Sequence, residues 1–215
     1  MNKASETASF FKNFSALFSG LVLVQIINFL FSLVLPKYFA PADFAEFGIF
    51  TSVVFILIEV VNAKLDIVVM LGKDDLETKK ILNAAFTIAV IIFSILLLVE
   101  LLFLFFLPKI YFLLPFTILL YGIHQPVLVY LNKQEKYAAV NYFRILQVLT
   151  TCAVTLLLAF QHVAHALVYG FIAGLTAATI LVLLYYRPKA DIQSTKEIWE
   201  KYDQFPKYGT WSSLL

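Results

Sequence analysis

The chain has 215 residues, of which 61% are hydrophobic and 14% are charged, and its formal net charge is +2. A soluble domain carries about 45–50% apolar and about 25% charged residues, so this composition argues against a soluble enzyme. The small net charge, with no basic stripe outside short loops, also argues against a nucleic-acid-binding protein. The single cysteine, Cys152, offers neither a disulfide framework nor a cysteine metal site.

Six apolar stretches are long enough to cross a bilayer, whose hydrocarbon core of about 30 Å requires about 20 helical residues. In chain order they are Ser15–Leu35, Phe44–Leu71, Ile81–Leu107, Tyr111–Leu131, Tyr137–Phe160 and Ala164–Tyr186. The first is too long for a signal-peptide core, so we expect it to be a retained helix. The sequence therefore predicts an all-α integral membrane protein. Residues 1–187 form its six-helix transmembrane bundle, and residues 188–215 form a linker and the start of a seventh span.

The distribution of Lys and Arg predicts the orientation of these spans. With the N-terminus in the cytoplasm, 12 of the 16 basic residues lie in cytoplasmic segments, and only Lys37 and Lys109 lie in outer loops. Cytoplasmic loops carry such an excess of positive charge. We therefore expect both ends of this segment to be cytoplasmic.

The second stretch carries ionisable residues at membrane depth, where each costs about 2.5–3.5 kcal/mol and suggests a function. On a continuous helix Glu59 and Asp66 share one small, polar arc, and Lys64 points well away from it. The two carboxylates are candidates for lining a pathway. The alternative is a buried ion pair that fixes helix packing.

The other spans also have polar sides. Arg144, Gln147 and Thr151 share an arc of the fifth stretch, Gln25 and Asn28 share a face of the first, and the fourth contains Tyr121, His124 and Gln125. Together these faces predict a bundle around a hydrated cavity, in which Arg144 pairs with Asp66 when substrate is absent. For single amides and hydroxyls, and for His124, helix packing is the competing interpretation.

No motif for ATP hydrolysis or for an enzyme site is present. The chain has neither a phosphate-binding glycine loop nor a Ser–His–Asp set, and we expect no cofactor. His162 and His165 lack a third ligand, so we expect no metal site. Gly170, Gly174 and Ala178 form a small-residue stripe that predicts a close helix contact.

Four stretches together resemble bacterial polysaccharide biosynthesis proteins, namely lipid-linked oligosaccharide (O-antigen or capsule repeat-unit) flippases of the multidrug/oligosaccharidyl-lipid/polysaccharide exporter superfamily. They are Leu33–Phe50, Ala63–Lys80, Tyr130–Gln147 and Lys201–Leu215. The second is similar to the family's Arg-Tyr-Glu-x-Ala-Ile-x-x-Pro-x-x-Asp segment. Lys64 and Asp66 keep the charge signs there, whereas Leu65 and Gly72 replace the tyrosine and proline.

The resemblance implies a bundle of 12 or more spans in two halves, of which this chain is the N-terminal one. A missing C-terminal half or a second copy is then an expected partner. The implied function is translocation of undecaprenyl-pyrophosphate-linked oligosaccharide across the bacterial cytoplasmic membrane. A drug or cation exporter of the same superfamily is an alternative, and a membrane enzyme of the same pathway is a weaker one because the outer loops are tiny.

The resemblance also suggests roles for the polar residues. Arg144 and Lys64 would pair with phosphate, while Glu59 and Asp66 would bind a coupling H⁺ or Na⁺ or hold the basic side chains. The remaining pathway candidates, all with side chains able to hydrogen-bond sugar hydroxyls, are Gln25, Asn28, His124, Gln147 and Thr151.

Overall fold

The computed structural model describes residues 3–103 and 108–209, and only the backbone of residues 3–14, 16 and 17. The long helices are α1 (Lys3–Val34), α2 (Pro41–Val61), α4 (Asp75–Leu102), α5 (Leu114–Lys133), α6 (Tyr137–Phe160) and α7 (Ala166–Tyr185). The short ones are η1 (Leu35–Lys37), α3 (Leu65–Val68), η2 (Val69–Leu71), η3 (Lys109–Leu113), α8 (Ile192–Lys201) and the π-helical turn η4 (Phe205–Gly209). Six helices are long and apolar enough to span a membrane. The predicted fold class is thereby confirmed.

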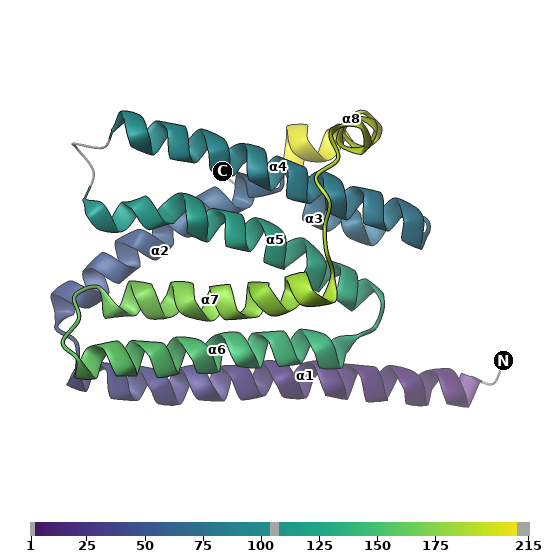
Figure 1. Cartoon of the computed structure of the whole chain (residues 1–215). Helices are drawn as coiled ribbons and strands as arrows, with labels where there is room; N and C mark the ends of the chain where they lie inside the picture. The colour runs from purple at the N-terminus through teal and green to yellow at the C-terminus, as the bar shows by residue number, and fades with distance from the viewer. Residues whose placement is uncertain (1–2, 104–107, 210–215) are drawn as a thin grey trace.

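The spans lie roughly side by side, with α5 in the middle. α1 packs on α6, α6 on α7 and α7 on α5, and α5 then packs against α4 and α2 (Figure 1). The segments between α3 and α4, between α5 and α6, and after α7 all lie at one end of the bundle, which we call the basic end. The opposite end carries η1, η3 and the turn between α6 and α7.

The hairpin of α6 and α7 packs through the small-residue stripe of α7, as the sequence predicts. A Cβ atom added at Gly174 would lie 2.0 Å from Thr151 Oγ1, and one added at Gly170 would lie 1.8 Å from Thr155 Oγ1. Such close approach requires glycine at both positions of α7.

The second predicted span, Phe44–Leu71, is not one helix. α2 ends at Val61, and Ala63 and Lys64 turn the chain with positive φ angles of 48° and 60° before α3 begins. The 21 residues of α2, at about 1.5 Å per residue, already cover about 31 Å, which is the thickness of the hydrocarbon core. The residues that follow are therefore free to turn at the basic end.

The turn after α2 places new apolar side chains in the core at the basic end. Leu65, Val68 and Val69 are fully buried, and α3 and η2 pack on α4 and α5. Left-handed backbone costs roughly 1–2 kcal/mol per non-glycine residue. Burying an aliphatic side chain from water contributes about 1.5–3 kcal/mol, so the burial of three offsets the two strained residues.

Two predicted boundaries fall partly outside the described residues. The third predicted span ends in residues 104–107, which lie outside the described residues. The predicted seventh span would start in residues 210–215, which also lie outside them. Between α7 and these last residues, α8 and η4 fill the segment that the sequence predicts as a linker.

Candidate functional site

Three charged candidates gather at the end of α2. Lys64 Nζ forms an ion pair with Glu59 Oε2 across the turn. Lys64 has left-handed backbone at the point where the chain turns after α2, and its ammonium reaches Glu59 in the last turn of that helix. The prediction that Lys64 points away from Glu59 assumed a continuous helix and is wrong.

Asp66 lies close to this pair but on α3, so it does not share a helical face with Glu59. Burial raises the pKa of Asp66, against the opposing influence of the Ile67 backbone N–H and of Lys64. Asp66 also lies outside the six candidate spans. Its carboxyl group is thus placed at the basic end rather than deep in the membrane, and it is poised to bind a proton.

Arg144 and His124 form the second group of candidates, on α6 and α5. His124 is 3% exposed, and neither of its ring nitrogens has a hydrogen-bond partner among the described residues. The guanidinium of Arg144 lies near enough for its charge to act on the imidazole. Both residues lie about two to three turns from the α5–α6 connection, so the pair sits at one depth in the bundle.

Arg144 is half-buried and lacks a carboxylate partner within the described part of the chain. The predicted pair with Asp66 is accordingly not formed there. A half-buried guanidinium carries five N–H donors and no acceptor, so the arrangement suits an anionic ligand.

Of the two other candidates on α6, the side chain of Thr151 and only the backbone of Gln147 take part in helix packing. Thr151 Oγ1 and the backbone carbonyl of Gln147 both lie against Gly174 of α7. The side chain of Gln147 is half-buried. The polar arc of α6 therefore begins at Arg144 and ends at Thr151, where it is covered by α7.

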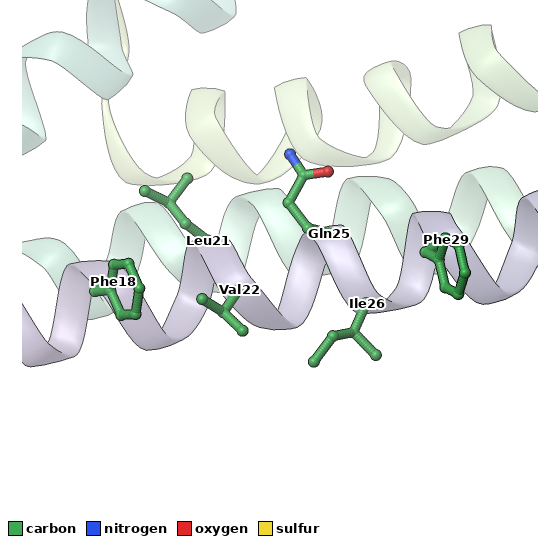
Figure 2. A pocket seen from close by; sticks show the side chains of 6 residues that line it. All are labelled: Phe18, Leu21, Val22, Gln25, Ile26 and Phe29. Carbon is green, nitrogen blue, oxygen red and sulfur yellow. The ribbon is translucent and has the colours of Figure 1, made fainter.

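The two candidates on α1, Gln25 and Asn28, are exposed and do not line a cavity shared with the other candidates. Gln25 lies in a shallow groove on α1 whose other lining residues, Phe18, Leu21, Val22, Ile26 and Phe29, are apolar (Figure 2). Gln25 and Leu21 point toward neighbouring helices, whereas Val22 and Ile26 point away from them (Figure 2). Asn28 is exposed as well. The structure thus joins Lys64 with Glu59 and places Arg144 within electrostatic range of His124, but Gln25 and Asn28 lie on α1, apart from both groups.

Two polar groups have environments that the sequence does not indicate: Lys133, whose contacts sequence reasoning missed, and Glu100, for which a solvated position at the end of the third span was one of the two interpretations. The ammonium of Lys133 on α5 donates hydrogen bonds to the carbonyl groups of Val69 (3.0 Å) and Gly72 (2.6 Å) and to Thr78 Oγ1 (2.8 Å). Glu100 near the opposite end of α4 is buried with Oε2 unpartnered among the described residues. A lysine next to a turn and a glutamate near a helix end are ordinary in sequence, and only folding reveals their environment.

Within residues 3–103 and 108–209, no group of three or more His, Cys, Asp or Glu side chains is arranged to hold a metal ion.

Comparison of the chain with protein-family models, with curated proteins and with solved structures finds no match. The chain is a membrane protein with six candidate spans.

Proposed function

We propose that the chain translocates an undecaprenyl-pyrophosphate-linked oligosaccharide across the bacterial cytoplasmic membrane for surface polysaccharide biosynthesis. The observation that carries the proposal is the half-buried Arg144, within electrostatic range of His124 and with no carboxylate partner in the described residues. A guanidinium fork matches the oxygens of a diphosphate, and charge-assisted hydrogen bonds of this kind are strong. The four short resemblances to the flippase family support the same substrate class.

The pairing of Glu59 favours an anionic substrate over a cationic one. Lys64 neutralises this carboxylate, so the basic end does not present the strongly acidic pocket that a cation exporter requires. Asp66 has a raised pKa and forms no ion pair within the described part of the chain. In this proposal Asp66 binds the coupling H⁺ or Na⁺, and Lys64 contributes positive charge near the substrate's entrance.

Two exposed amide side chains on α1 support a second six-span unit as partner. Asparagine and glutamine side chains are costly against lipid and are commonly paired across helices. Gln25 and Asn28 are exposed on α1. Either a C-terminal half or a second copy of this chain would cover them and complete the path, and sugar hydroxyls would then bind along the joint surface.

Deletion of the gene in the source bacterium tests the proposal. The expected result is loss of surface polysaccharide, with lipid-linked repeat units accumulating in the cytoplasmic leaflet, and restoration by the unmodified gene. Intact polysaccharide with increased drug sensitivity would favour a drug exporter instead. Absence of assembled chains despite normally translocated repeat units would indicate a membrane enzyme of the same pathway.

A further inference from the structure

The short helix α8 lies across the spans rather than along them. Figure 1 shows α8 close to end-on beside the first turns of α4, whereas the spans run across the page. Hydrogen bonds fix the start of α8 to α4, from the backbone N–H of Asp191 to Thr87 Oγ1 (3.1 Å) and from that of Lys189 to Asn83 Oδ1 (3.0 Å). Ile198, which is buried, packs into the core beneath α8.

One side of α8 faces the terminus of α4. Gln193, Glu197 and Lys201 follow each other at four-residue spacing and therefore share this side. Glu197 pairs with Lys80 at 3.4 Å, and Lys201 pairs with Glu77. Both partners belong to the polar first turns of α4, before its apolar run begins.

The side of α8 away from these ion pairs carries exposed apolar residues. Ile192, Lys196 and Trp199 have a spacing of four and three residues, which places them together on the helix, with Ile192 and Trp199 roughly opposite Glu197. Ile192 is 80% exposed and Trp199 is 42% exposed. Two large apolar side chains are therefore exposed on the side of α8 away from its ion pairs with the first turns of α4.

The depth of α8 follows from its contacts with α4. The apolar run of α4 begins at Ile81. Thr87, which binds the start of α8, lies about 9 Å farther along the helix at about 1.5 Å per residue. The first turn of α8 thus lies about 9 Å beyond the start of the apolar run, within the depth of about 5–10 Å to which interfacial helices are buried.

We propose that α8 is an interfacial helix that lies in the headgroup–acyl boundary of the bilayer, with Ile192 and Trp199 inserted among the lipid chains. Amphipathic helices bind membranes in this orientation, and tryptophan is enriched at this depth. The exposed basic residues Arg187, Lys189 and Lys196 complement anionic headgroups. Lys196 extends its stem from the apolar side toward the phosphates. This role does not depend on the substrate that the spans transport.

Tryptophan fluorescence tests the proposal. The chain has two tryptophans, so Trp211→Phe leaves Trp199 as the only one. In phosphatidylethanolamine–phosphatidylglycerol vesicles, we expect blue-shifted emission that is quenched strongly by lipids brominated near the headgroup. Quenching by lipids brominated near the chain end should be weaker, and aqueous iodide should quench little.

A matched control moves the probe to the other side of α8. In the Trp199→Phe, Trp211→Phe background, Gln193→Trp introduces a single tryptophan whose fluorescence should be quenched by iodide. The brominated lipids should quench this fluorescence at least twofold less than they quench that of Trp199. Strong iodide quenching of Trp199 without lipid quenching would place α8 in water and overturn the proposal. Quenching of Trp199 by neither agent would mean that protein covers this side, which would overturn it as well. The Trp199 result decides the matter even if the control variant fails to fold.

Discussion

Lys64 binds Glu59 across the turn at which α2 ends, so the last turn of this span and the residue that reverses the chain are held together by one ion pair. The side chain of Lys64 is mostly buried, at 14% exposed, and that of Glu59 is 40% exposed. Removing one partner leaves an uncompensated charge in a partly dry environment.

We therefore expect Lys64→Ala to lower the stability of the protein by roughly 1–3 kcal/mol, somewhat less than the cost of breaking a fully buried pair. The melting temperature in detergent measures the effect. The double variant Lys64→Ala, Glu59→Gln should recover much of the loss, because it removes both charges. Equal melting temperatures for Lys64→Ala and the unmodified protein would show that the pair is not formed in solution.

The contact between α6 and α7 makes a second prediction. A Cβ atom at Gly174 would lie 2.0 Å from Thr151 Oγ1 and 2.5 Å from the carbonyl oxygen of Gln147. Overpacking of this kind costs about 1–3 kcal/mol. Gly174→Ala should accordingly reduce the melting temperature and the folded yield.

Gly48 on α2 provides the matched control, since no atom of the described residues lies within 4 Å of a Cβ atom there. Gly48→Ala should leave the melting temperature unchanged or raise it slightly, because alanine favours the helix over glycine. A comparable loss in both variants would argue that the effect arises from the helix backbone and not from the α6–α7 contact.

The excess of Lys and Arg at the basic end predicts the membrane orientation. A reporter that is active only in the periplasm should be active when fused after Lys109, which belongs to the opposite end, and silent when fused after Lys80 or Lys136. Protein abundance of each fusion is the control. The reverse activity pattern would place the basic end outside the cytoplasm and refute the orientation.

The cap of α8 predicts a pH dependence. The Asp191 carboxylate accepts hydrogen bonds from the Ser194 hydroxyl at 2.6 Å and from the backbone N–H groups of Ser194 and Gln193 at 3.1 Å. These bonds hold the pKa of Asp191 below its ordinary value. A carboxyl group with a lowered folded pKa stabilises the helix above its unfolded pKa of about 3.9 and loses this contribution as pH falls through the folded value.

Hydrogen exchange at the Gln193 and Ser194 amides, corrected for intrinsic rates, measures this cap. We expect protection that is complete near neutral pH and that disappears in strongly acidic solution. Asp191→Asn should keep its protection at every pH, because asparagine caps helices without titrating. Protection of the unmodified protein that does not change with pH would contradict the role of the charged carboxylate.

The helices could be predicted from the sequence because hydropathy alone reports which segments can cross a bilayer. The break after Val61 could not, since the apolar run continues to Leu71 and nothing in its composition marks residues 63 and 64 as left-handed. The Gly170–Gly174 stripe did predict a helix contact, because small residues have few other uses in a span.

The candidate site was less accessible to sequence reasoning. The arc of Glu59 and Asp66 depended on an uninterrupted helix, so the break after α2 removed it and replaced it with the Glu59–Lys64 pair. The polar arc of α6 was recognised, but the side of Thr151 that contacts Gly174 depends on how α7 is packed. Helical periodicity places residues on a face and does not identify what that face contacts.

Export by Arg144 variants, introduced into the gene in its own genome, tests the central claim most directly. Arg144→Ala should abolish export of lipid-linked repeat units, and Arg144→Lys should retain only part of it, because an ammonium does not reproduce the planar fork of a guanidinium on a diphosphate. Both variants should be inserted at normal abundance, since no described carboxylate pairs with Arg144. Unchanged export by a well-expressed Arg144→Ala protein would contradict a role for this residue in binding the substrate.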